Sequence, residues 1–134
     1  MPQATFLYLV TAGVFLSLDF IGIRYLIRPV FERHVGDLLA EPLRLGPAAL
    51  FYLAYVAGLL WMVSWPALKA GDPVQALIGG MVLGFLCYGT YEMTNYATLA
   101  AWSLEQVIVD VIWGTLLTGF AAWVGVAVLA GKIA

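Results

Sequence analysis

Four long apolar stretches constrain this chain more than any other feature of its sequence. They cover residues 6–23, 48–65, 74–96 and 104–130. Each has about 18 residues or more, which at ~1.5 Å per helical residue is enough to cross a hydrocarbon core of ~30 Å. Because backbone N–H and C=O groups in lipid must be paired within the segment, such stretches form helices. The sequence therefore predicts an all-α fold, an integral membrane four-transmembrane-helix bundle.

The composition supports a membrane protein and excludes other classes. Of the 134 residues, 63% are hydrophobic and only 10% are charged, whereas soluble domains average about 25% charged residues. A soluble domain of this length could not bury so much apolar surface. The small net charge of -2 gives no reason to expect a nucleic-acid partner. We expect a single domain over residues 1–134, with membrane lipid as its first partner.

The chain has one cysteine, Cys87, and one histidine, His34. An intrachain disulfide, a dithiol redox pair, bis-histidine haem ligation and a histidine-rich metal centre are therefore excluded. We predict no cofactor and no metal. Cys87 is interpreted as a small buried apolar group and His34 as a surface histidine near the lipid head groups.

Basic residues predict the orientation. The segment between the first two stretches holds four arginines, and only Lys69 and Lys132 lie elsewhere. The positive-inside rule places this segment in the cytoplasm and both termini outside, in a cell inner (plasma) membrane. Within the segment, residues 29–40 are amphipathic, which predicts a short interfacial helix between spans one and two.

Three acids fall inside the predicted spans, at one depth. Asp19, Glu92 and Asp110 each lie roughly 7–10 Å inside the same leaflet, although the orientation was assigned without them. Acids in lipid turn toward the bundle interior, because facing lipid costs ~2.5–3.5 kcal/mol or more. Helical spacing adds polar and aromatic residues to the same faces. We predict a ligand pocket lined by Asp19, Tyr88, Tyr91, Glu92, Asn95, Asp110 and Trp113.

Several other residues are interpreted as supporting the fold or the acids. Arg24 is the nearest basic candidate for a counter-ion to the acids. Trp61, Trp65, Trp102 and Tyr25 are interpreted as interfacial belts. Helix starts are marked by Asp72-Pro73 and by a capping box of Ser103 and Gln106. Small residues at four-residue spacing predict close helix packing at Ala76, Gly80 and Gly84.

Several functions fit these residues. The first is binding of a small amphipathic molecule or lipid in an acidic and aromatic pocket in the cytoplasmic half of the bundle, because a carboxyl there can donate a hydrogen bond, carry a proton or bind a cation. An alternative is a proton- or cation-coupled transporter working as a homo-oligomer. Further alternatives are a structural or assembly subunit, in which the acids only hold the helices together, and a lipid-modifying enzyme, the least favoured because no nucleophile–base set is present.

One motif carries a resemblance. It runs from Tyr88 to Asn95, continues with Ala97-Thr98-Leu99 and Trp102, and is followed by Asp110 with Trp113-Gly114. Together with Asp19, it resembles a bacterial family of predicted small four-helix integral membrane proteins, a domain-of-unknown-function family without assigned activity. The resemblance implies the four-helix fold and the same choice of residues, and it implies no substrate.

Overall fold

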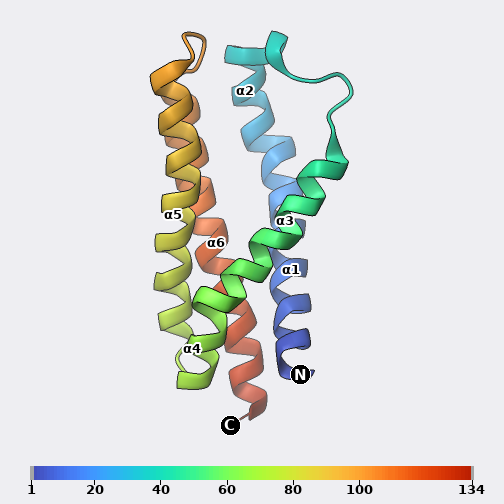
Figure 1. Ribbon diagram of the computed structural model, residues 1–134, viewed down its shortest axis with the longest axis vertical. Helices are drawn as coiled ribbons and strands as arrows, with labels where there is room; N and C mark the ends of the chain where they lie inside the picture. Colours follow the sequence, from blue (N-terminus) through green and yellow to red (C-terminus); the bar gives the residue numbers. More distant parts are fainter. Residues whose placement is uncertain (1, 134) are drawn as a thin grey trace.

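The computed structural model describes the backbone of residues 2–133 and the side chains of residues 2–130. All regular structure in this part of the chain is helical, in four antiparallel rods (Figure 1). Each rod is long and apolar enough to cross a membrane, over Pro2–Leu38, Leu45–Ala70, Pro73–Thr98 and Leu104–Ala130. The predicted all-α, four-span bundle is confirmed. The N- and C-termini lie at the same end of it.

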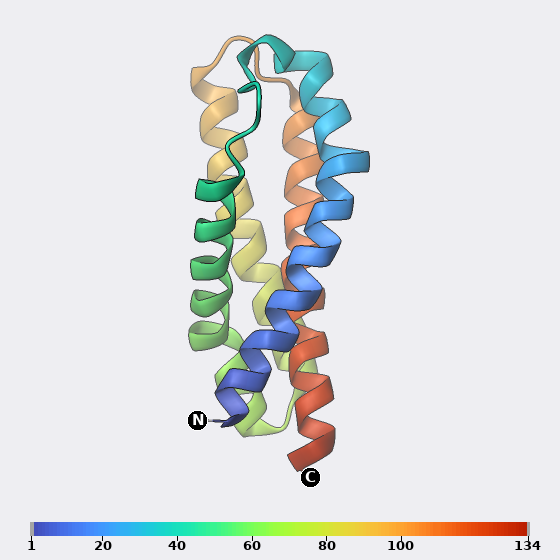
Figure 2. The same ribbon diagram turned by 90° about the vertical axis from the view of Figure 1, so that its right-hand side faces the viewer.

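The first rod is longer than the predicted span. It consists of α1 (Pro2–Gly22), a π-helical segment η1 (Ile23–Ile27), α2 (Arg28–Val35) and a short 3-10 segment η2 (Gly36–Leu38). The amphipathic segment expected as a separate interfacial helix is thus helical, but it continues α1 without a break (Figure 2). The two parts join because the backbone stays in the right-handed helical region from Gly22 through Arg28.

The second rod has the same construction. It consists of α3 (Leu45–Leu59), a π-helical segment η3 (Leu60–Ser64) and α4 (Trp65–Ala70). Each π segment ends immediately before an X-Pro pair, Arg28-Pro29 in the first rod and Trp65-Pro66 in the second. A proline ring clashes with the carbonyl four residues earlier. The wider π turn gives that carbonyl room, so the helix passes the proline without ending.

The third and fourth rods are α5 (Pro73–Thr98) and α6 (Leu104–Ile133). The predicted caps are present. The Asp72 side chain accepts a hydrogen bond from the Gln75 N–H at 3.2 Å. At the start of α6, the Gln106 N–H donates to Ser103 Oγ at 3.1 Å, and the Ser103 N–H donates to Gln106 Oε1 at 2.9 Å. This reciprocal pair is the predicted capping box.

Glycines bring α5 and α6 into close contact. A Cβ at Gly80 would lie 2.9 Å from Gly119 Cα, and a Cβ at Gly84 would lie 2.9 Å from Thr118 Cβ. These distances are shorter than van der Waals contact, so only glycine permits this packing. Ala76, one turn earlier, is fully buried. The small-residue packing predicted for the third span is therefore observed.

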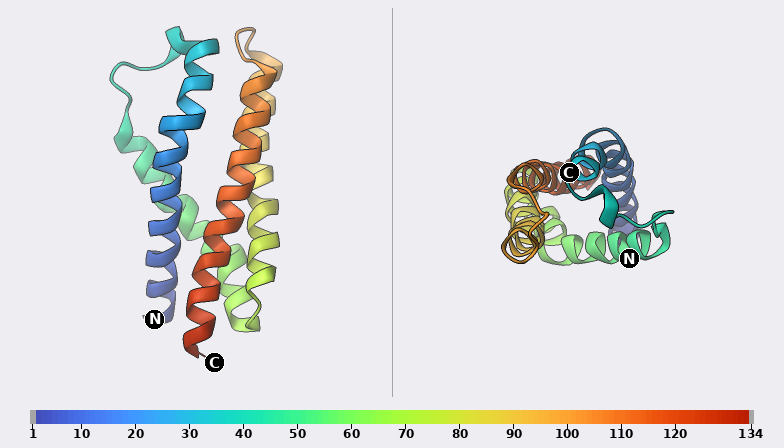
Figure 3. Two further views of the ribbon diagram at one scale, coloured as in Figure 1. Left: turned by 180° about the vertical axis from the view of Figure 1, so that it is seen from behind. Right: turned by 90° about the horizontal axis from the view of Figure 1, so that it is seen from above.

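The position of α3 divides the bundle into two halves. We call the end with the 39–44 segment and the 99–103 turn the loop end, and the end with the two termini the terminal end (Figure 1). At the terminal end, η3 and α4 contact both α5 and α6. Toward the loop end, α3 runs obliquely away from α5, as the view from above shows (Figure 3). The backbones of α3 and α5 therefore lie farther apart in the loop half than in the terminal half (Figures 1 and 3).

Candidate functional site

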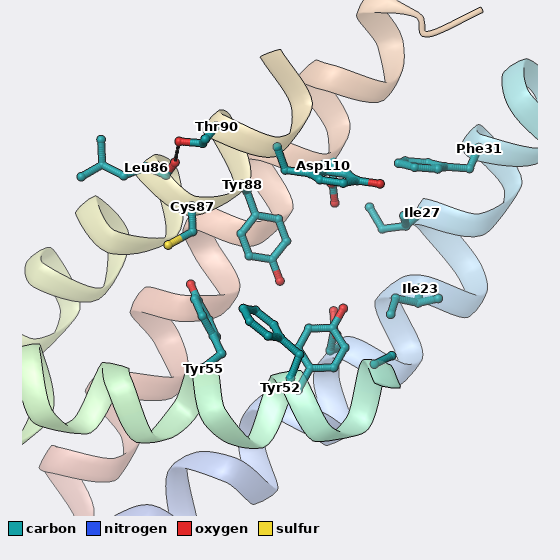
Figure 4. A pocket seen from close by; sticks show the side chains of 14 residues that line it. Ile23, Ile27, Phe31, Tyr52, Tyr55, Leu86, Cys87, Tyr88, Thr90 and Asp110 are labelled. Carbon is teal, nitrogen blue, oxygen red and sulfur yellow. Dashed lines mark hydrogen bonds between the residues drawn. The ribbon is translucent and has the colours of Figure 1, made fainter. Parts of the chain in front are cut away.

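A pocket of about 840 Å³ occupies the loop half of the bundle. Its walls come from the first rod, α3, α5 and one residue of α6 (Figure 4). The lining residues are Asp19, Ile23, Ile27, Phe31, Ala48, Phe51, Tyr52, Tyr55, Leu86, Cys87, Tyr88, Thr90, Tyr91 and Asp110. The pocket exists because α3 diverges from α5 at this end, while the rest of the bundle remains packed.

The mouth of the pocket lies between α3 and α5. Exposed residues of both helices frame it, namely Ala48, Phe51, Leu86, Thr90 and Tyr91. The two lining acids, Asp19 and Asp110, are 3% and 7% exposed and form the back. The pocket therefore leads from an apolar side opening to a buried acidic wall.

Asp19 ties α1 to the neighbouring helices. Its Oδ1 accepts a hydrogen bond from Trp113 Nε1 at 3.2 Å, and its carboxylate also interacts with Tyr52 of α3. The Trp113 ring reaches this position across Gly22, where a side chain would collide with the indole. Trp113 therefore lies behind the acidic wall and holds the Asp19 carboxyl in place.

Glu92 lies behind Asp110 and does not line the pocket. It is fully buried, and its Oε1 accepts a hydrogen bond from Trp102 Nε1 at 2.9 Å. The Asp110 carboxyl is within hydrogen-bonding range of the Glu92 carboxyl and also interacts electrostatically with Asp19. The three acids predicted at one depth thus form one continuous group across α1, α6 and α5.

The predicted interfacial position of Trp102 is wrong. It was expected in an interfacial belt, but it is only 9% exposed and binds Glu92. Its ring also meets Phe31 and Tyr91 edge-on, with centroid distances of 5.3 and 5.8 Å. Trp102 therefore joins α2 to α5 at the loop end and supports two pocket residues from behind.

No cationic side chain among residues 2–130 pairs with the acidic group. Among side chains 2–130, no lysine, arginine or histidine forms an ion pair with Asp19, Glu92 or Asp110. The prediction of Arg24 as the counter-ion is wrong, because its side chain is exposed and its Cζ lies 5.6 Å from the centroid of the Tyr25 ring. The acidic charge at this site is therefore not balanced by the part of the chain that is described.

The nearby basic residues instead pair with another acid. Glu105 accepts a hydrogen bond from Arg33 Nη2 at 2.8 Å, and its other oxygen lies 2.8 Å from His34 Nε2. All three side chains lie at the surface. This contact links α2 to the first turn of α6, and the predicted surface position of His34 agrees with it.

Tyrosines form the wall opposite the first rod. The ring centroids of Tyr52 and Tyr55 lie 5.7 and 5.5 Å from that of Phe15. Tyr55 meets Tyr88 edge-on, with 6.4 Å between their centroids. Tyr52, Tyr55 and Tyr88 point into a common space (Figure 4). The Tyr55 hydroxyl also lies 2.9 Å from Thr118 Oγ1. The sequence prediction missed Tyr52 and Tyr55, although their three-residue spacing in a span without charges was an available signal.

The structure separates the seven predicted pocket residues into three groups. Asp19, Tyr88, Tyr91 and Asp110 line the pocket, whereas Glu92 and Trp113 support its acidic wall from behind. Asn95 is half-buried on α5, one turn from Tyr91, and interacts with the Tyr91 hydroxyl. Cys87 was interpreted as buried, but it is exposed and lines the pocket.

In the described part of the chain, no three His, Cys, Asp or Glu side chains are arranged to hold a metal ion. What the site offers is two buried carboxyls at its surface, a third behind them, and aromatic rings around them.

Comparison with models of protein families shows which family the chain belongs to. The model of a family described as "Predicted membrane protein (DUF2177)" matches residues 4–127. The chain belongs to this family. The DUF2177 match covers most of each of the four helical rods and every pocket residue, and it agrees with the membrane-spanning fold. No curated protein and no solved structure matches the chain.

Proposed function

We propose that this protein binds a small amphipathic molecule with a cationic head, such as a lipid-like amine, in the pocket of the loop half. The head would lie at Asp19 and Asp110, and the apolar part would point toward the mouth. One observation carries the proposal: buried carboxyls that pair with no cationic side chain among residues 2–130 form the back of an aromatic pocket that opens between two helices.

The energetic argument starts from the acids. An ionised carboxylate buried without a partner is costly, and such groups in membrane segments pair with cations or retain protons. Asp19 and Asp110 both reach the pocket surface, so a ligand cation can approach either of them. A bound cation would replace the missing counter-ion.

The aromatic residues favour a ligand of this class. A cation within about 6 Å of an aromatic centroid is attracted to the ring face by ~2 kcal/mol or more when desolvated. Tyr52, Tyr55 and Tyr88 supply three rings beside Asp19. The pocket volume also falls within the range of about 300–1,000 Å³ found for small-molecule sites.

The mouth favours entry from the side. Phe51 and Leu86 are 68% and 55% exposed, and both lie well inside the candidate spans. A ligand with an apolar tail can therefore leave the tail among lipid chains while its head reaches the acids. By the positive-inside rule, this half belongs to the cytoplasmic leaflet.

Equilibrium binding in lipid nanodiscs tests the proposal. Tetraphenylphosphonium is a permanent lipophilic cation, and tetraphenylborate is an anion of nearly the same shape. We expect saturable binding of the cation only, and weakening by about tenfold or more in Asp19→Asn, which corresponds to ~1.4 kcal/mol. Asp72→Asn is the matched control, because it removes an acid at the terminal end and asparagine also caps helices. Equal binding of both probes would refute the proposal.

Native mass spectrometry of the protein released from its own membrane separates the alternatives. A retained added mass that is lost in Asp110→Asn supports a bound ligand and gives its mass. A clean mass of the monomer, together with destabilisation in the same variant, would indicate that the acids only hold the helices together. A homodimer with the added mass would direct attention to transport.

A further inference from the structure

We infer that ligand binding expels a proton held between Asp110 and Glu92, so that the protein exchanges a cation for a proton. The inference rests on the proposed function and deepens it, because it assigns a role to the acid behind the pocket. Asp110 faces the ligand space, Glu92 does not, and the two carboxyls are within hydrogen-bonding range of each other.

The first argument is geometric. Two ionised carboxylates contain only hydrogen-bond acceptors, so a hydrogen bond between them requires a proton on one of them. Glu92 Oε2 is fully buried and accepts no hydrogen bond from the N–H and O–H donors of the described side chains. One proton on the pair supplies the missing donor. The Trp102 indole occupies the other Glu92 oxygen, which keeps the carboxyl oriented.

The second argument concerns charge. Two adjacent carboxylates repel each other, so their simultaneous ionisation is unfavourable, especially away from water. In the empty pocket, a retained proton reduces the negative charge of the three acids by one unit. A cation at Asp110 does the same, and the site then no longer needs the proton. Cation and proton therefore compete for one negative charge.

Surrounding groups do not neutralise the pair in another way. The groups that face it are Asp19 on α1, Tyr52 on α3, Tyr88 and Tyr91 on α5, and the Trp102 indole. All of these are acidic or neutral. The Gln106 Nε2 atom is fully buried without a partner, one helical turn before Asp110. It extends the buried polar groups toward the 99–103 turn at the loop end.

The exchange balances in charge and atoms. The O–H bond of the protonated carboxyl breaks, its electron pair stays on the carboxylate, and the proton passes to water. The ligand cation takes the place of the proton beside the carboxylate. No oxidant, reductant or covalent intermediate is needed, and the net charge of the site is the same before and after exchange.

Counting protons tests the inference. Tetraphenylphosphonium is added to the purified protein in weakly buffered detergent solution at neutral pH, with a pH indicator. Because this probe has no proton of its own, any acidification comes from the protein. We expect about one proton released per bound cation and an affinity that falls by up to ~tenfold per unit decrease in pH. Saturable binding without proton release would overturn the inference and leave the proposed function intact, whereas absence of binding would refute both.

A variant assigns the proton to the pair. In Glu92→Gln the second carboxyl is replaced by an amide that can donate to Asp110, so the proton is no longer needed. We expect fewer than about half as many protons per bound cation. The control Asp72→Asn should match the unmodified protein. Release equal to the unmodified protein in Glu92→Gln would overturn the role of Glu92. If this variant does not fold, the proton count of the unmodified protein still decides the inference.

Discussion

The two halves of the bundle hold their helices in opposite ways. In the terminal half, the backbones of α5 and α6 approach at Gly80 and Gly119, and the core is made of apolar residues such as Leu59 and Val126. In the loop half, α3 separates from α5 (Figure 3), and polar side chains join the elements: Trp113 on α6 donates to Asp19 on α1, and Trp102 in the 99–103 turn donates to Glu92 on α5.

This difference shows what small and polar residues each achieve in lipid. Small residues allow close packing and leave no space, because attraction between backbones in lipid depends on contact. Polar bridges span a wider gap and can leave a cavity between helices, at the cost of burying groups that need partners. The first kind of contact is found in the terminal half, and the second is found around the pocket.

Gly80→Leu should break the terminal half. The new side chain would meet Gly119 Cα and the Thr118 carbonyl oxygen, which are backbone atoms that cannot move aside. We expect a loss of about 3 kcal/mol or more in the free energy of unfolding, measured by circular dichroism during titration with a denaturing detergent. Gly89→Ala is the control on the same helix, because a Cβ there meets no atom within 4 Å. An unchanged unfolding curve in Gly80→Leu would contradict the close packing of α5 and α6.

Trp102→Phe should weaken the loop half. It keeps an aromatic ring beside Phe31 but removes the N–H that Glu92 accepts. Loss of a partner from a buried carboxyl predicts destabilisation of about 2 kcal/mol in the same unfolding assay. Trp61→Phe should be neutral, because Trp61 is 79% exposed. Equal effects of the two substitutions would show that Trp102 acts only as an interfacial residue.

Tyr55→Phe should have the smallest effect, and it tests the connection between the halves. Its hydroxyl pairs with Thr118, which is fully buried near the α5–α6 contact. We expect a loss of about 1 kcal/mol with the pocket shape kept. Tyr25→Phe serves as its reference, since Tyr25 is 70% exposed. If both variants unfold like the unmodified protein, this hydroxyl does not contribute to joining the two halves.

Much of the fold could be predicted because it depends on local patterns. The four spans follow from apolar length, and the starts of α5 and α6 follow from Asp72 and from the Ser103 box. The common depth of Asp19, Glu92 and Asp110 also follows from counting residues along straight helices. The continuity of the first rod was harder to predict, because the residue before a proline usually marks a helix boundary, whereas here the π turn before Pro29 lets the helix continue.

The pocket itself was only partly predictable. Helical periodicity shows which residues share a face, but it does not give the angle at which α3 leaves α5. For this reason Tyr52 and Tyr55 were missed. The same limit applies to Trp102, because an indole near the end of a span can face lipid or the bundle, and only the packing of α2 against α6 decides between them. Cys87 is exposed for the same reason, since α3 leaves its face of α5 open.

Because the mouth of the pocket opens sideways, the apparent affinity of a ligand depends on how the ligand partitions into lipid. A ligand that enters between α3 and α5 comes from lipid, so its relevant concentration is the amount per unit of bilayer. That amount is set by the partition coefficient of the ligand and by the quantity of membrane present. Two ligands with equal contacts in the pocket will therefore differ in aqueous potency by the ratio of their partition coefficients, and adding empty vesicles will compete with the protein for both of them.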